Sequence, residues 1–424
     1  MVLIKLDHIT KIEGHGSLHV QVEEGEVKEV QMGAVEGARF FEAVVKGREF
    51  HEIPTLTSPI CGICSQAHVL ASISAIECAT GIEPSHQTVL MRELLNIGQY
   101  VQSHNVHTHF LVLPDYFGYG DAIAMMDKHE DVVKRALKFK RWASSFCTLV
   151  GGRDMHPVCA QVGGFSHIPD KGKLSDMIST LKELRPEAMK IAEIFGSLKY
   201  PDFERKKDYA SLIQENKYPL ISGDVTIGQT RFSPSEYLDN VSESTKAYSP
   251  SKYSLFKGKS FMVGSLARIN NNLPNLSDNA KVAIAHSEIT FPNNNPFTNN
   301  FAQAVEIVHC VDRAIDILEN HRLKREQWIH PRKLKIQNGR GVGAVEAPRG
   351  TLYHDYTISK GIIQSANIIT PTVQNLNCLE DDVRAYLPKI LDSDEKTVVA
   401  ELEKLVRAYD PCCSCSVHYL DVRR

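Results

Sequence analysis

The 424-residue sequence contains no run of 18 or more consecutive apolar residues, so it offers no candidate for a membrane-spanning helix. It also lacks a surplus of charge of one sign, because 48 basic and 51 acidic residues give a net charge of −3. A general nucleic-acid binder or a binder of anionic membranes would need a basic surplus. The first residues lack the basic, apolar and small-residue regions of a secretory signal. These absences predict a cytoplasmic protein with no nucleic-acid partner and no direct membrane insertion.

The composition is that of a folded protein, with 42% hydrophobic and 23% charged residues. The same percentages exclude long disordered segments. The length allows about three domains, or one large domain with excursions. Ten cysteines in a cytoplasmic chain are expected to be reduced, and to serve as core residues, metal ligands or redox groups.

Hydrophobic spacing predicts the fold class α+β, mainly α. We expect a bundle of long helices with small antiparallel sheets near the N-terminus and in the later half, in a single domain spanning 1–424. Alternating apolar residues predict a β-hairpin region at 1–35. The segment of about 198–300, rich in Pro, Gly, Asn and Ser, is expected to be an irregular, partly extended excursion. A period near 3.6 residues predicts helices at about 63–81, 86–111, 122–149, 173–197, 300–323, 376–391 and 395–409.

Two Cys-x-x-Cys pairs are the strongest candidates for a functional site in the sequence. Cys61 and Cys64 form one pair and Cys412 and Cys415 the other, 348 positions further on (412 minus 64). Two intervening residues turn the chain back, so that both thiolates can bind one ion. A four-sulfur set suits zinc, iron–sulfur clusters and other thiophilic metals. A histidine, His418, follows three residues after the last cysteine and favours a metal site, but spacing alone leaves a structural zinc clip open.

Four segments beside the cysteine pairs narrow the choice. They are TKIEGH at 10–15, RFFE at 39–42, EAPRG at 346–350 and IITPT at 368–372. Together with the cysteine pairs, and in this order and spacing, they resemble the large subunit of the nickel–iron hydrogenases over residues 7–418. The compact length and the RFFE segment are most similar to the cytoplasmic, bidirectional, NAD(P)-linked branch, including the archaeal sulfhydrogenases.

The resemblance implies a nickel–iron centre that catalyses heterolytic cleavage and formation of dihydrogen. Cys61 and Cys412 would be terminal nickel ligands. Cys64 and Cys415 would bridge nickel to an iron that also holds one carbon monoxide and two cyanides. Glu13 would accept protons beside Cys412 and relay them toward the surface.

The same resemblance implies a second metal site and a processed C-terminus. Glu42, His418 and the backbone carbonyl of Ile368 would bind Mg²⁺ or a similar cation. A maturation protease would remove the tail 419–424 after nickel insertion, which leaves His418 as the mature end.

The surroundings of the metals are implied in the same way. Arg349 would place its guanidinium over the open side of the metals. Pro348 and Thr372 would line the diatomic ligands, with Thr372 as a donor. Asp115 and Asp410 would hold Arg349 and the nearby backbone in place.

His68 follows the first cysteine pair by four residues and therefore lies on the same face of the following helix. We expect it to donate a hydrogen bond to a bridging sulfur. The remaining cysteines lack pair spacing and are expected to be small core residues: Cys78, Cys147, Cys159, Cys310, Cys378 and Cys413.

The chain cannot carry electrons away by itself. It has no further cysteine framework for iron–sulfur clusters, and its glycine-rich stretch GRGVG at 339–343 leads into EAPRG and not into a helix. An iron–sulfur small subunit and a flavin-containing NAD(P) module are therefore implied as partners. Two alternatives remain: a metal-free subunit like the quinone-site subunit of a complex I relative, and a zinc-clipped structural protein. The complex I subunit lacks the cysteine pairs, and metal content separates all three.

Overall fold

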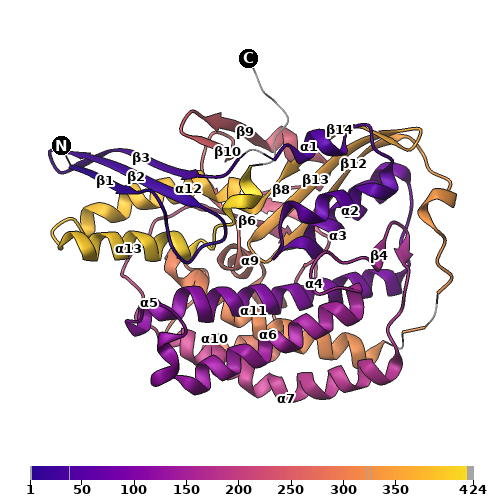
Figure 1. The fold of residues 1–424 in the computed structure, drawn as a ribbon, viewed down its shortest axis with the longest axis horizontal. Coiled ribbons are helices and arrows are strands. Elements are labelled where there is room, and N and C mark those ends of the chain that lie inside the picture. Colours follow the sequence, from indigo (N-terminus) through magenta and orange to yellow (C-terminus); the bar gives the residue numbers. More distant parts are fainter. Residues whose placement is uncertain (1, 38, 322, 325, 418–424) are drawn as a thin grey trace.

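The computed structural model describes residues 2–37, 39–321, 323–324 and 326–417 (Figure 1). The expectations for His418 and for the tail 419–424 lie outside the described residues. The helices are α1 (Phe41–Val45), α2 (Ile53–Thr57), α3 (Ser65–Thr80), α4 (His86–Val106), α5 (Leu113–Phe117), α6 (Glu130–Gly151), α7 (Lys171–Gly196), α8 (Tyr237–Asn240), α9 (Ser265–Asn272), α10 (Asp278–Ala285), α11 (Asn299–Asn320), α12 (Pro371–Tyr386) and α13 (Glu395–Ala408). The strands are β1 (Val2–Leu6), β2 (Gly16–Glu23), β3 (Glu26–Ala34), β4 (Ala160–Gln161), β5 (Gly164–Phe165), β6 (Asp208–Ile213), β7 (Asp224–Ile227), β8 (Thr230–Phe232), β9 (Val241–Lys246), β10 (Ser249–Phe256), β11 (Phe261–Met262), β12 (Gly339–Ala347), β13 (Gly350–Ser359) and β14 (Ile362–Ile369).

The predicted fold class, α+β with mainly helices, is confirmed. Helices α4, α6, α7, α10 and α11 pack against one another in one layer, below the sheets in Figure 1. Helix α6 begins at Glu130 and not near 122, because a separate turn precedes it. Gly118 ends α5 in a left-handed conformation, and the Asp121 carboxylate accepts a hydrogen bond from the Ala124 amide to cap that turn.

The N-terminal hairpin is part of a three-stranded antiparallel sheet in the order β1-β2-β3. Along β2 the buried side chains alternate with partly exposed ones, and Leu18, Val20 and Val22 form the buried face. This face contributes to the core, and α12 packs against β3. The connection between β1 and β2 contains the TKIEGH segment, and this segment lies beside the C-terminal cysteines.

The segment 198–300 is more regular than expected. It contains a four-stranded sheet in the order β11-β6-β7-β8, the antiparallel pair β9–β10, and helices α9 and α10. Strand β11 has only two residues and pairs in parallel with β6, about 50 residues earlier in the chain. A strand of two residues is too short to show an alternating pattern in the sequence, and its pairing partner is distant, so a local pattern does not reveal it.

The sheet β12-β13-β14 lies against α3, with its strands in antiparallel order. The glycine-rich stretch of β12 makes the contact with α3. A Cβ atom at Gly341 would lie 2.2 Å from the Ala79 nitrogen, and one at Gly343 would lie 2.2 Å from the Ala71 carbonyl oxygen. Glycine is thus needed for a close backbone approach. This packing sets the end of β12, which leads to Arg349, relative to the start of α3, which follows Cys64.

Candidate metal centre

The two cysteine pairs meet although they lie at opposite ends of the chain. Cys61 follows a short 3₁₀ turn at Ser58–Ile60, and Cys64 is the N-cap residue of α3. Cys412 forms a parallel β-bridge with Glu13, and the next 3₁₀ turn, Cys413–Ser416, carries Cys415. The N-terminal segment before β2 therefore supports the C-terminal pair directly.

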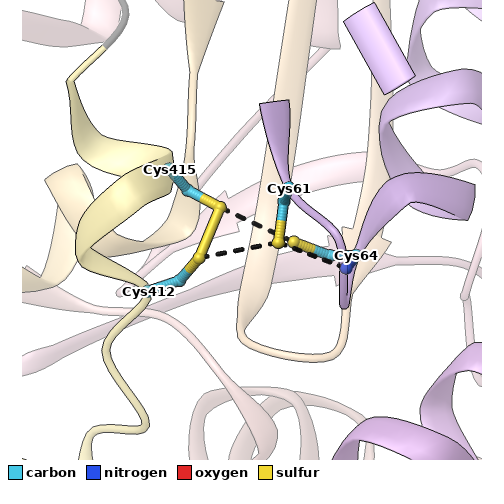
Figure 2. A group of neighbouring side chains, drawn as sticks. All are labelled: Cys61, Cys64, Cys412 and Cys415. Atoms are coloured by element: carbon cyan, nitrogen blue, oxygen red, sulfur yellow. Dashed lines mark hydrogen bonds between the residues drawn. A yellow bond between two sulfur atoms is a disulfide. The ribbon is translucent and has the colours of Figure 1, made fainter. Parts of the chain in front are cut away.

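The four sulfur atoms form one buried cluster, shown in Figure 2. The Sγ atoms of Cys61 and Cys412 are 3.6 Å apart, and those of Cys64 and Cys415 are 3.7 Å apart. All four lie within 4.8 Å of one another. An ion with metal–sulfur bonds of about 2.3 Å in a tetrahedron places its sulfurs about 3.8 Å apart, so the cluster has the dimensions of a four-thiolate site.

Cys412 and Cys415 are joined by a disulfide in the structure. This differs from the expectation that every cysteine is reduced. The thiolate, and not a disulfide sulfur, is the metal ligand, so binding by all four cysteines requires this pair in its dithiol form. Burial raises the pKa of the Cys61 thiol, but hydrogen bonds from Cys64 and the charge of Arg349 outweigh it and leave that pKa below its usual value. The donor set therefore fits a thiophilic metal once the pair is reduced.

Arg39 fastens the two cysteine segments to each other. Its guanidinium donates to the Ile60 carbonyl at 2.5 Å and also to the Ser414 carbonyl. The first oxygen precedes Cys61, and the second lies between the C-terminal cysteines. Sequence reasoning used Arg39 only as part of the RFFE segment and missed this role. One nitrogen, Nη2, donates to both carbonyls, so a single charged side chain links the two segments.

Glu13 contacts the cluster as predicted. Its Oε2 lies 2.8 Å from Cys412 Sγ, a hydrogen-bonding distance when that sulfur carries a proton. Its Oε1 accepts a hydrogen bond of 2.5 Å from the Ser414 hydroxyl. The Cys413 amide donates to the Glu13 carbonyl at 3.0 Å. Both the backbone and the carboxylate of Glu13 are thus positioned by the segment that carries the cysteines.

Arg349 occupies the turn between β12 and β13 and is buried. Its Nε donates to the Asp410 carbonyl at 2.9 Å, and Nη2 is 2.8 Å from Asp410 Oδ1. Burial opposes the charge on Arg349, but Asp410 and the cysteine thiolates hold its pKa above the usual value. Burial likewise tends to raise the pKa of Asp410, and Arg349 lowers it on balance. The structure therefore places a fixed, paired cation beside the sulfurs, with the predicted partner Asp410.

Asp115 does not pair with Arg349 itself, and of the expected role only the support of the nearby backbone is seen. Its carboxylate pairs with Lys11 and, at 2.5 Å, with the Arg407 Nε. Lys11 lies two residues before Glu13, and the Arg407 carbonyl accepts a hydrogen bond from the Asp410 amide at 2.8 Å. Asp115 thus supports the backbone on both sides of the site. Many charged residues of the sequence could pair with the Asp115 carboxylate. Its pairing with Lys11 and Arg407 is decided only by the fold.

Thr372 contacts the segment of Cys412, and Pro348 directly precedes Arg349. The Thr372 hydroxyl oxygen accepts a hydrogen bond of 2.9 Å from the Cys412 amide. The Pro348 carbonyl accepts from Arg268 at 2.8 Å. Thr370, which sequence reasoning missed, donates to the Cys415 carbonyl at 3.0 Å.

His68 is buried on α3 but has a partner other than the one expected. Its Nδ1 lies 3.0 Å from Nε2 of His354, and Nδ1 of His354 lies 2.6 Å from the Tyr356 hydroxyl. Nδ1 of His68 thus begins a chain of polar contacts toward β13, and a hydrogen bond from His68 to a bridging sulfur stays a prediction. Burial lowers the pKa of His68 to about 3, so its ring is neutral near pH 7.

Glu42 and Ile368 lie together, as expected for residues of one cation site. The Ile368 amide donates to Glu42 Oε1 at 2.8 Å, and Lys252 Nζ is also 2.8 Å from that oxygen. Burial raises the pKa of Glu42, and Lys252 opposes this shift. The third expected ligand, His418, lies outside the described residues, so the cation site stays a prediction.

Among the cysteines without pair spacing, Cys78 is exposed, which contradicts its assignment to the core. The other five are buried, as expected. Cys413, which stands between two predicted ligands, packs with Ala34 and Val417, and burial raises the pKa of its thiol to about 12. It therefore belongs to the apolar surroundings of the cluster.

Comparison with known proteins identifies the family to which the chain with this cysteine cluster belongs. The sequence matches the nickel-dependent hydrogenase family over residues 39–134 and 178–418. Sulfhydrogenase 1 subunit alpha of Pyrococcus furiosus is 37% identical over 420 residues, covering 98% of this chain and 97% of that protein. NAD-reducing hydrogenase HoxS subunit beta of Cupriavidus necator is 28% identical over 461 residues, covering 98% of this chain and 94% of that protein. The chain therefore belongs to the nickel-dependent hydrogenase family.

The fold supports the same conclusion. The crystal structure of an NAD⁺-reducing [NiFe]-hydrogenase in the H₂-reduced state superimposes with a TM-score of 0.86 at 24% identity, covering 99% of this chain and all of that one. This chain is a hydrogenase large subunit, an oxidoreductase that acts on dihydrogen. The family match favours this assignment over both the metal-free subunit and the zinc-clipped protein. No helix within the described ranges is long and apolar enough to span a membrane.

Proposed function

We propose that this chain binds a nickel–iron centre through Cys61, Cys64, Cys412 and Cys415, with one carbon monoxide and two cyanides on the iron. The single observation that carries the proposal is the buried set of four sulfurs within 4.8 Å of one another, in a chain of this family. The sulfurs of Cys61 and Cys412 face each other, as do those of Cys64 and Cys415. By the family resemblance, Cys61 and Cys412 would be the terminal ligands and Cys64 and Cys415 the bridging ones. When bound, the centre supplies the open coordination position at which dihydrogen is cleaved heterolytically.

The residues of the chain would handle the proton. Cys412 Sγ takes it up as a thiol, and Glu13 Oε2, 2.8 Å away, accepts it. The Ser414 hydroxyl holds the other carboxylate oxygen, so the acceptor stays aimed at the sulfur. Arg349 contributes a fixed positive charge beside the open side of the site. Asp410 prevents that guanidinium from turning away.

We further propose that Glu42, the Ile368 carbonyl and His418 bind Mg²⁺ or a similar cation near the C-terminus. Hard oxygen ligands and water suit such an ion. We expect a maturation protease to remove residues 419–424. Intact-mass measurement of active protein would show an end at His418, and an active chain that still carries the tail would disprove the processing.

The partners follow from what this chain does not supply. The relatives are named as subunits, and one of them as a subunit of an NAD-reducing hydrogenase. We propose an iron–sulfur small subunit, followed by a flavin-containing NAD(P) module, in a cytoplasmic complex.

The decisive experiment is infrared spectroscopy of protein purified from its native host, in the window where metal-bound carbon monoxide and cyanide absorb. One carbonyl band and two cyanide bands are expected, together with nickel and iron by elemental analysis. Fully matured protein with zinc alone and no such bands would overturn the proposal.

A further inference from the structure

Arg268 on α9 is a fully buried arginine close to the turn that carries Arg349. Its Nε and Nη2 pair with the two carboxylate oxygens of Glu306 on α11, at 2.6 and 2.8 Å. Its Nη1 donates to Glu346 Oε2 at 3.0 Å. The guanidinium is therefore fixed from two sides by carboxylates of the core.

Arg268 also donates to the Ser265 hydroxyl at 3.1 Å, and two further hydrogen bonds go to the backbone of that turn. Nη1 donates to the Ala347 carbonyl at 3.0 Å, and Nη2 donates to the Pro348 carbonyl at 2.8 Å. These are the two residues immediately before Arg349. Tyr100 also fixes the backbone before this turn, because its hydroxyl donates to the Glu346 carbonyl at 3.0 Å and to the Ala347 carbonyl at 3.2 Å.

The turn is short, since Ala347 and Gly350 are paired residues of β12 and β13 with only Pro348 and Arg349 between them. With both preceding carbonyls directed at Arg268, rotation of this backbone is restricted, and the Arg349 side chain is left facing Asp410. A buried ion pair alone is weak evidence for a stabilising role, because apolar residues often replace one without loss. The planar guanidinium of Arg268, however, bonds two consecutive carbonyls and a carboxylate at once, which fixes the geometry of the turn.

We infer that Arg268 is a positioning residue for Arg349: it fixes the Pro348 turn and thereby sets the guanidinium of Arg349 against the cysteine cluster. The inference rests on the proposed function for its consequence in catalysis, but its structural part concerns only the turn. Glu306 and Tyr100 orient Arg268 and share this task.

The test is Arg268→Lys in the complete enzyme purified with its partners. Lysine keeps the charge but cannot reach Glu306 and both carbonyls at once. We expect the nickel content to persist, kcat to fall about tenfold or more with little change in KM, and the carbonyl and cyanide bands to shift. Hydrogen exchange in the peptide 344–352 should accelerate about tenfold.

Arg92→Lys is the matched control. Arg92 is also buried and forms a two-pronged pair with Glu77, at 2.7 and 2.6 Å, without contacting the Arg349 turn. Arg92→Lys should lower the thermal midpoint and leave kcat, the infrared bands and exchange in 344–352 unchanged. If Arg268→Lys behaves like Arg92→Lys in all of these, Arg268 is only structural and the inference is wrong.

Tyr100→Phe keeps the test decisive if Arg268→Lys does not accumulate. It removes one hydroxyl from the same backbone, so a smaller band shift and faster exchange in 344–352 are expected, and unchanged values would overturn the inference. Failure of the proposed function is recognised separately, because wild-type enzyme would then show no carbonyl or cyanide bands. The exchange comparison would still decide the role of Arg268.

Discussion

Replacing Glu13 by glutamine tests the proton path most directly. Glutamine has nearly the same shape, so it can retain the backbone bridge to Cys412 and the hydrogen bond from Ser414. Its amide cannot take up and release a proton as a carboxylate does. Cys412 Sγ lies only 2.8 Å from Glu13 Oε2, so no other group is needed between sulfur and acceptor.

The size of the effect follows from that direct contact. Positioned acid–base groups contribute about 10²- to 10⁴-fold to rate, so Glu13→Gln should lower the rate of dihydrogen oxidation by about 100-fold or more. Nickel content and infrared bands should stay near wild type, because no metal ligand changes. The assay is dihydrogen oxidation with excess artificial acceptor, together with exchange between D₂ and water protons.

Glu36→Gln is the matched control. Glu36 Oε1 accepts a hydrogen bond of 2.9 Å from the His15 amide, so this carboxylate supports the same loop through its backbone and not through a cysteine sulfur. This variant should keep full activity. A Glu13→Gln enzyme with wild-type turnover and wild-type exchange would remove Glu13 from the proton path.

Three further predictions concern ligation, packing and pH. Cys412→Ser should abolish activity by removing nickel or its proton acceptor, which elemental analysis and turnover assays would detect; an active, nickel-loaded variant would contradict the ligand assignment. Gly341→Ala should lower the free energy of unfolding by about 3 kcal/mol or more, because its Cβ would lie 2.2 Å from a backbone nitrogen of α3 that cannot yield. Gly120→Ala, where nothing lies within 4 Å, should change urea unfolding little, and equal effects would refute the packing argument. Burial lowers the pKa of His109 and of His309 to about 4, so both stay neutral in the fold while the unfolded chain takes up protons below pH 6.5. Stability should therefore fall by ~2 kcal/mol per histidine between pH 7 and pH 5, and equal urea midpoints for wild type and His109→Gln at both pH values would oppose this.

The long helices were predictable because their signal is local. The 3.6-residue period located α3, α4, α7, α11 and α13 within a few residues. It failed before α6, where two glycines and an aspartate cap made a separate turn. It also failed in 198–300, where strands as short as β11 owe their existence to partners far along the chain.

The position of the metal centre was predictable for a chemical reason. Cysteine pairs at this spacing have few uses, and the segments around them carried the family resemblance, so residue types and spacing were enough to propose Cys61, Cys64, Cys412 and Cys415 as one site. Glu13 and the Arg349–Asp410 pair followed from the same segments. The structure places Glu13 against Cys412 and Arg349 against Asp410, and their roles stay predictions.

What only the tertiary structure decided is which side chains share a hydrogen bond. Asp115 pairs with Lys11 and Arg407, His68 meets His354, and Cys78 is exposed. Each outcome depends on residues up to several hundred positions away, whose distances no local pattern encodes. The sequence determined which four thiols are the candidate donors, because ligand chemistry resides in residue types. The fold determined which side chains contact them, because such contacts depend on geometry.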